Sequence, residues 1–395
     1  MKISFPHFGC VTGYKKILEK FGHDVIVPKT PTRTTMELGV KYSPEFICFP
    51  FKVMLGTYIE CAMAGAEVIV TSGGSGPCRA GMYSDIHQKI LNDLGYKTQV
   101  IVFDSMYKDF SKFMEKIKMI TGGKSILSIL KTIVFGAQLV DKMDKLEKKL
   151  KILRAYEINF GEFNRAWNNI ISDFDSCTTI KDVRHAYKCG LDTLTKIPIK
   201  NVPENEKIRV GIVGEIYVIM ERSVNKNIEE TLNTLGVEVE NVQYTSDWVR
   251  DHLTPQWFPY PKVHRVAKLS DEVSPLNTGG HEKHNMGWIF DFKKRGFDGV
   301  VHLMPFACLP ELVNLGKFPA ISKELDMPIL SLSLDEQLGE AHIKTRVEAF
   351  TDLIRSKHFM IEPVIQKPDD GAVKKPRVLV PEGEMSYAIK NAAKL

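Results

Sequence analysis

The sequence predicts an α/β protein with two parallel-sheet domains and an all-helical insert between them. Short apolar runs alternate with amphipathic stretches in residues 1–111 and again in residues 206–360. This alternation is typical of parallel sheets that are covered by helices on both faces. In residues 112–205 the apolar spacing is helical throughout, which indicates a helical connector. Residues 361–395 are expected to form a C-terminal tail.

The first domain is expected to contain four strands separated by helices. Gly22 follows a run with helical spacing, as glycine commonly does at the end of a helix. The expected strands are residues 3–5, 24–28, 67–71 and 98–103, and the expected helices are residues 15–21, 53–64 and 83–94.

The insert and the second domain follow in the same way. The charged amphipathic stretch 141–151 is typical of a helix, and Pro198 and Pro203 mark a linker. In the second domain, a long loop containing Pro and His is expected before the third strand and its preceding helix. The expected strands are residues 208–214, 237–242, 299–303 and 328–332, and the expected helices are residues 225–235, 287–295 and one after Pro310.

Composition argues against several classes of protein. The net charge of +5 is small for 395 residues and comes largely from a lysine-rich helix, so nucleic-acid binding is not expected. No run of 18 apolar residues is present, so we expect no membrane span. A strand-like segment stands where a signal peptide would be, which predicts a cytoplasmic location. Seven cysteines in that compartment are metal ligands or buried thiols more often than disulfides.

Three cysteines, Cys48, Cys78 and Cys308, stand in similar settings, each with a proline within two residues. Proline fixes φ and lacks a backbone donor, so a cysteine beside it tends to lie in a loop or at the first turn of a helix. Cys78 and Cys308 also follow expected strands, and ligands of open α/β sheets bind beyond the carboxyl ends of strands. The pattern predicts an iron–sulfur protein. The alternative is that each is a buried thiol that packs as a small apolar side chain.

Polar residues near these cysteines are candidates for supporting roles. Arg79 is placed to hydrogen-bond to a cluster sulfide or to pair with an anionic substrate. Glu215 follows the expected strand 208–214, and Glu311 follows Cys308 by three residues. Either carboxylate would suit proton supply in reductive chemistry, and either would equally suit a helix N-terminus.

Two other motifs are not expected to carry chemistry. His281 and His284 are close in sequence, but no further metal ligand accompanies them. The glycine-rich segment 73–76 lacks the Lys-Ser/Thr pair of a P-loop, so nucleotide hydrolysis by this chain is not expected.

Five segments, in order along the chain, resemble the acyl-CoA dehydratase activase-related proteins, often called CoA protein activases. That family is related to the 2-hydroxyacyl-CoA dehydratase subunits and to the double-cubane cluster proteins. The resemblance covers residues 1–357 and implies two flavodoxin-like or Rossmann-like domains with a cluster between them. The segments are YSPEFICFPFK at 42–52, GGSGPCR at 73–79, VGIVGEIY at 210–217, MPFACLPE at 304–311 and LDEQLGE at 334–340.

Carried over residue by residue, the resemblance implies that Cys48, Cys78 and Cys308 hold a [4Fe-4S] cluster with one iron left open. It also implies reductive chemistry on a small molecule or an acyl-CoA, a homodimer, and an actin-fold ATPase activator that carries its own cluster and delivers low-potential electrons. An alternative is a cluster-bearing scaffold or electron carrier without a substrate of its own.

The number of clusters depends on the remaining cysteines. Cys10 is either a fourth ligand or a loop thiol. A double-cubane [8Fe-9S] cluster needs six cysteines, and the other three, Cys61, Cys177 and Cys189, are expected to pack within helices. A single [4Fe-4S] cluster is therefore the preferred expectation.

Overall fold

The computed structural model describes residues 1–73, 77–103, 110–253, 261–275 and 278–360. Residues 1–359 pack into one compact unit that contains both sheets and the helical region. Residues 360–395 form a second unit, of which only Met360 is described. The expected tail 361–395 and glycine-rich residues 74–76 lie outside the described residues.

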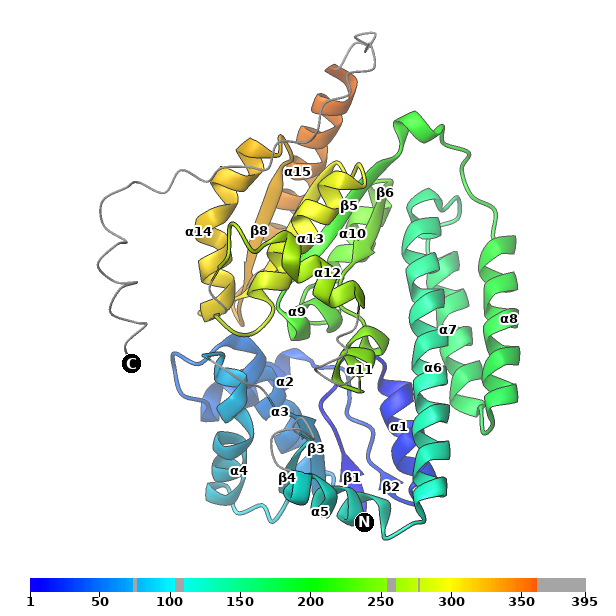
Figure 1. Cartoon of the computed structure of the whole chain (residues 1–395), viewed down its shortest axis with the longest axis vertical. Coiled ribbons are helices and arrows are strands. Elements are labelled where there is room, and N and C mark those ends of the chain that lie inside the picture. Colours follow the sequence, from blue (N-terminus) through cyan, green and yellow to red (C-terminus); the bar gives the residue numbers. More distant parts are fainter. Residues whose placement is uncertain (74–76, 104–109, 254–260, 276–277, 361–395) are drawn as a thin grey trace. The chain divides into compact units, whose positions relative to one another are not determined.

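The first sheet has four parallel strands, as the alternating pattern predicted, and their order is β2-β1-β3-β4 (Figure 1). Strand β2 is only two residues long, shorter than expected. The helix α2 was not expected from the sequence. The elements are β1 (Lys2–Ser4), α1 (Val11–Lys20), β2 (Asp24–Val25), α2 (Arg33–Tyr42), α3 (Phe49–Met63), β3 (Val68–Ser72), α4 (Tyr83–Asp93) and β4 (Gln99–Phe103).

The second sheet repeats the same topology, with parallel strands in the order β6-β5-β7-β8. The third strand along the chain, β3 or β7, therefore occupies the same place in each sheet. The elements are β5 (Ile208–Gly214), α9 (Ile216–Met220), α10 (Ile228–Thr234), β6 (Val237–Asn241), α11 (Thr245–Leu253), α12 (Pro261–Leu269), α13 (Glu282–Lys294), β7 (Gly299–Pro305), α14 (Leu309–Glu324), β8 (Ile329–Leu334) and α15 (Glu340–Met360).

Two expectations for the second domain were wrong in detail. The expected loop containing Pro and His includes helices α11 and α12. Both helices are short and rich in polar residues, so apolar spacing did not indicate them. Helix α13 begins at Glu282, five residues earlier than the expected start at 287. Its first turn holds polar residues, so apolar spacing in the sequence did not indicate where the helix begins.

The helical region between the sheets is confirmed as α5 (Phe110–Thr121), α6 (Ile126–Leu153), α7 (Glu162–Ser176) and α8 (Ile180–Lys196). Helix α6 has 28 residues and is therefore about 42 Å long. It packs against α7 and α8 (Figure 1), and it also contacts α1 of the first sheet and β6 of the second. The long helix thus joins the two sheets along one side.

No single described helix is long and apolar enough to span a membrane. A pair of segments, Met114–Thr121 and Ile126–Tyr156, meets the length and composition criteria only when taken together, and it is bent by 85°.

An apolar core continues from one sheet to the other. One cluster of buried side chains includes Phe51, Leu55 and Tyr58 of α3 together with Val210 and Leu303 of the second sheet. Beside it, the ammonium of Lys52 lies 2.7 Å from Glu336 Oε1. Lys52 is buried, so this ion pair is stronger than an exposed one and links α3 to the end of β8.

Helices α2 and α3 cross with their backbones in contact at two glycines. A Cβ atom at Gly56 would lie 1.9 Å from the carbonyl oxygen of Thr35, and one at Gly39 would lie 1.8 Å from that of Lys52. No side chain fits at either position. This crossing therefore sets where α3 lies, and with it the residue that precedes α3, Cys48.

We predict that Gly56→Ala destabilises the protein by about 3 kcal/mol or more, because the added methyl would overlap a backbone carbonyl that cannot move alone. Gly316→Ala is the matched control. Gly316 also lies within a helix, and a Cβ there meets no atom within 4 Å, so alanine should be neutral or stabilise by up to about 1 kcal/mol. Urea denaturation under identical conditions compares the two, and equal effects would contradict the backbone contact.

A buried carboxyl group joins α6 to α11. Asp144 Oδ2 accepts a hydrogen bond of 2.7 Å from the backbone N–H of Ser246. Burial, followed by the nearby charge of Glu147, raises the pKa of Asp144 from its usual 3.8 to about 7. The folded state therefore binds a proton at this site more tightly than the unfolded state does.

A raised carboxyl pKa contributes stability that is fully present below pH 3.8 and is lost as the pH rises through about 7. We predict that Asp144→Asn, which keeps the acceptor for Ser246, removes this loss. The free energy of unfolding of the wild type, relative to Asp144→Asn, should fall by up to about 4 kcal/mol between pH 4 and pH 7.5. Urea titrations at several pH values measure the difference, and parallel pH profiles would refute the assignment.

Candidate functional site

All three cysteines singled out from the sequence are the residues immediately before a helix. Cys48 precedes α3, Cys78 precedes the short 3₁₀ helix η1 (Arg79–Met82), and Cys308 precedes α14. Each has an extended backbone and none caps its own helix with a hydrogen bond from its side chain. Proline in the first turn of α3 and α14 starts the helix there, as predicted. Helix N-termini favour negative charge, including thiolate.

Arg79 joins the three cysteine-bearing loops. It directly follows Cys78, and its guanidinium donates one hydrogen bond of 2.8 Å to the carbonyl oxygen of Phe46 and another to that of Ala307. Phe46 lies two residues before Cys48, and Ala307 lies one residue before Cys308. One side chain therefore holds loops that are far apart in the sequence and that belong to different sheets.

The loop before α13 also contacts the Cys78 loop. A Cβ atom at Gly279 would come 3.2 Å from the backbone nitrogen of Cys78, and one at Gly280 would be 4.0 Å from Cys78 Sγ and 3.2 Å from Pro310. Both glycines have positive φ, which glycine adopts without strain. The pair allows close approach of the second domain to Cys78 and to the start of α14.

The thiols lie in a largely desolvated environment. Cys48 and Cys308 are buried, whereas Cys78 is partly exposed. Burial is the main cause that raises the pKa of all three thiols, and in Cys308 the charges of Glu215 and Glu311 add to it. The three are close enough to interact electrostatically, Cys48 with Cys78 and with Cys308. Cys48 Sγ is also hydrogen-bonded to the hydroxyl of Tyr83.

In the described part of the chain, no group of three or more His, Cys, Asp or Glu side chains is arranged to hold one metal ion. In a [4Fe-4S] cluster each cysteine binds a different iron, so the thiolates are farther apart than the ligands of a single ion such as zinc. Cysteine thiolates, which Cys48, Cys78 and Cys308 can supply, are the donors that such a cluster uses. The donor set therefore suits an iron–sulfur cluster better than a hard ion such as Mg²⁺ or Ca²⁺, which prefers oxygen ligands.

The two candidate carboxylates differ in their surroundings. Glu215 precedes α9, and its Oε2 accepts hydrogen bonds from the backbone N–H groups of Tyr217 and Val218. Burial raises its pKa to about 7 against the effect of these two bonds. It is thus a helix cap, one of the two roles considered from the sequence, and it also lines the cavity described below.

Glu311 is enclosed by hydrogen bonds. Its Oε1 accepts from Asn285, and its Oε2 accepts from Asn314 and is 2.8 Å from His302 Nε2. Asn285 in turn donates to the carbonyl oxygen of Gly214, at the end of β5. This network holds the start of α14 against β5 and α13, so its geometry favours a positioning role for Glu311 over proton transfer.

The structure does not bring Cys10 together with the three other cysteines. Its thiol contacts Met143 Sδ at 3.5 Å, and its backbone N–H donates to the hydroxyl of Thr245. It belongs to the apolar cluster of the helical region and lines a different cavity. Of the remaining cysteines, Cys61 and Cys177 are buried, and Cys189 is exposed on α8.

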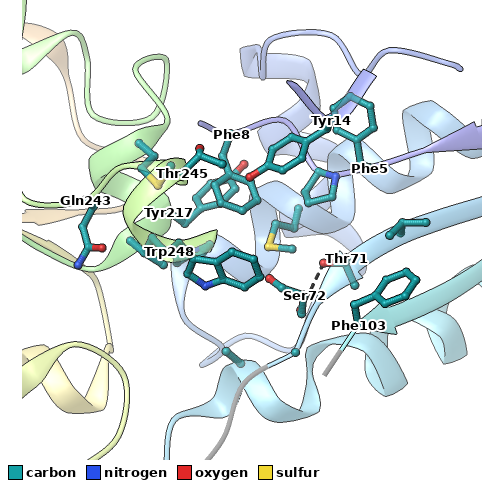
Figure 2. A pocket seen from close by; sticks show the side chains of 18 of the residues that line it. Phe5, Phe8, Tyr14, Thr71, Ser72, Phe103, Tyr217, Gln243, Thr245 and Trp248 are labelled. Carbon is teal, nitrogen blue, oxygen red and sulfur yellow. Dashed lines mark hydrogen bonds between the residues drawn. The ribbon is translucent and has the colours of Figure 1, made fainter. Parts of the chain in front are cut away.

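A cavity of about 640 Å³ opens beside the cysteines and is mostly apolar. Cys78, Cys308, Glu215 and Glu311 line one part of it, together with His281 and His284. Figure 2 shows aromatic rings gathered around another part, among them those of Phe5, Phe8, Tyr14, Tyr217 and Trp248.

Sequence reasoning missed several of these residues. His281 and His284 were considered only as a metal pair, yet they line the cavity beside Cys78. The carbonyl oxygens that accept from Arg79 have no sequence signature. In the structure α13 precedes β7 as α3 precedes β3, so His281 occupies in the second sheet the position that Cys48 occupies in the first. The sequence did not indicate this, because the start of α13 was expected at residue 287.

No model of a known protein family matches the chain, and a search of the curated proteins finds no match either.

We predict that Arg79→Ala loosens the three loops, because two hydrogen bonds from a charged donor are lost at once. Alkylation of Cys48 and Cys308 in the metal-free protein, followed peptide by peptide with mass spectrometry, should be about tenfold faster or more. Arg33→Ala is the control, since Arg33 is almost fully exposed and pairs with Glu37 on its own helix. Unchanged rates at both cysteines would show that Arg79 does not hold the loops.

Proposed function

We propose that Cys48, Cys78 and Cys308 bind a [4Fe-4S] cluster with one open iron between the two sheets, and that the protein uses it to reduce a small molecule or an acyl-CoA. The observation that carries the proposal is the meeting of three Pro-flanked cysteines at the starts of three helices from two different sheets. When bound, the cluster supplies low-potential single electrons. The resemblance to the CoA protein activase family points to the same ligand set.

The chain's own residues have separable roles in this proposal. Arg79 holds the three loops in register and places a positive charge beside the anionic thiolates, which favours their charged form. Gly279 and Gly280 let the α13 loop approach without steric overlap. Glu215 borders the same cavity as Cys78 and Cys308, where a carboxyl group can exchange protons with a bound molecule.

The cavity favours an enzyme over an electron carrier. A carrier needs only an enclosed cluster, whereas a reductase needs space for a substrate beside it. Cys78 and Cys308 border a space of about 640 Å³, which is within the range of small-molecule sites. Cys10, which would close a fourth coordination position, lies elsewhere. These observations support the first function, and a carrier stays the second candidate.

The partner is part of the proposal. The described residues include no P-loop, and residues 74–76 lie outside them. Electrons of low enough potential would therefore come from a separate actin-fold ATPase with its own cluster. A homodimer, a cytoplasmic location, a double-cubane [8Fe-9S] alternative, and the absence of nucleic-acid or membrane binding likewise stay predictions.

We predict that replacing Cys48, Cys78 or Cys308 singly by Ala abolishes the cluster, because two thiolates are too few anchors. Cys177→Ala and Cys10→Ala are the controls, since both thiols are buried elsewhere. Anaerobic purification followed by iron and sulfide counting and EPR spectroscopy distinguishes the variants. It also separates one cubane from two.

The ligand assignment is refuted for any of the three residues whose Ala variant keeps full iron content and an unchanged spectrum. Cluster loss in Cys10→Ala, with the fold retained, would instead make Cys10 a fourth ligand and favour the carrier.

We further predict that reduction of the cluster requires an activator and ATP. The purified chain is mixed with an actin-fold ATPase of the dehydratase-activator type, a strong reductant and ATP, and EPR follows the reduced cluster. Omission of ATP or of the activator should leave the cluster oxidised, because the electron must be driven to low potential. Equal reduction in all mixtures would remove the reason for the partner and favour the carrier.

A further inference from the structure

The cavity beside the cysteines has an aliphatic arm. Tyr14, Ile17, Leu18 and Phe21 of helix α1 and its C-terminal cap all line it. These positions are spaced i, i+3, i+4 and i+7 and therefore form one stripe along the helix. From Tyr14 to Phe21 the stripe extends for about 10 Å. The lining of the cavity thus runs along α1 in addition to the part beside the cysteines.

Residues of α5 and α6 also line this arm. Ile117, Ile120 and Thr121 of α5, and Ile129 and Ile133 of α6, line the cavity. No charged residue of the described lining lies on α1, α5 or α6. The wall of the arm is therefore made largely of branched aliphatic side chains.

The cysteines of the lining have polar neighbours. Gly280 lies beside Cys78 and Pro310, and the adjacent His281 lines the same part. Glu215 interacts electrostatically with both Cys78 and Cys308. The cavity therefore has one part with thiols, carboxyls and imidazoles, and another part that is mainly aliphatic and whose polar groups are the phenol of Tyr14 and the hydroxyl of Thr121.

We infer that this cavity binds a molecule with a long aliphatic chain, such as a fatty acid, with its polar end toward the cysteines and its chain along α1. An amphipathic, elongated ligand matches a lining that is polar at one end and aliphatic over several residues of one helix face. Burial of the chain supplies the affinity, and the polar end sets the orientation. The identification of this ligand as the substrate rests on the proposed function. The inference that the cavity binds it rests on the lining of the cavity alone.

The test uses the metal-free full chain and isothermal titration calorimetry with hexanoate, octanoate, decanoate and dodecanoate. Affinity should rise about fourfold with each added methylene for as long as the chain stays within the arm. The same series is measured on Ile133→Trp and Ile129→Trp, which fill the arm, and on Leu130→Trp. Leu130 lies on the same helix with half of its side chain exposed, so it is the matched control.

In Ile133→Trp or Ile129→Trp, the gain beyond octanoate should disappear, while Leu130→Trp should behave as the wild type. Circular dichroism identifies a filled variant that fails to fold, and the other then decides. Affinity that does not depend on chain length, or equal affinities in filled and control variants, would overturn the inference. Tighter binding of 2-naphthoate than of dodecanoate would also overturn it, in favour of a compact aromatic ligand.

An additional variant separates this inference from the proposed function. The triple variant Cys48→Ala, Cys78→Ala, Cys308→Ala should lose iron and keep the chain-length dependence. If the wild type binds iron but its affinity for fatty acids does not depend on their length, only the proposed site for the aliphatic chain is refuted. An intact chain-length dependence in a wild type that binds no iron would refute only the cluster.

Discussion

The contact between the loops after β3 and β7 is the constraint on which the site depends. Both strands occupy the third position of sheets with the same order, so each places its following loop at a carboxyl edge, where open α/β proteins bind ligands. Arg79 after β3 reaches the carbonyl oxygen of Ala307 after β7. Without this contact, Cys78 and Cys308 would belong to two unrelated sheet edges. The shared apolar core and the buried Lys52–Glu336 pair stabilise the same arrangement.

Unusual backbone geometry positions two of the three cysteines. Ala307 has a φ of +61°, a conformation that is unfavourable for a residue with a Cβ atom. The turn it makes directs its carbonyl oxygen to Arg79 and places Cys308 at the start of α14. Gly56 and Gly39 have a comparable effect at Cys48, because their backbone contact sets the position of α3. Each cysteine is thus positioned by contacts outside its own loop, as a rigid multi-thiolate site requires.

The buried polar residues around the site divide into two groups. Glu311, Asn285 and His302 form a network whose hydrogen bonds hold α14, α13 and the second sheet together. Glu215 faces the cavity and has a raised pKa, which is more typical of functional groups than of structural ones. The hydrogen-bond partners make the distinction, since both residues are glutamates and both lie near the start of a helix.

The sequence by itself determined the elements whose signals are local. Apolar runs of strand length and helical spacing in residues 112–195 each depend on a few neighbouring residues, so the two parallel sheets and the helical region were predicted correctly. Proline near Cys48 indicated a helix start there, but α3 begins at Phe49, four residues before its expected start. Helix α2, the early start of α13, and α11 and α12 were missed because their apolar spacing is short or interrupted. Only the tertiary structure decided that Arg79 reaches Phe46 and Ala307, that Cys10 packs against α6, and that α1, α5 and α6 enclose an aliphatic arm. Those outcomes depend on contacts between residues that are distant along the chain, and residue spacing carries no information about which distant surfaces meet.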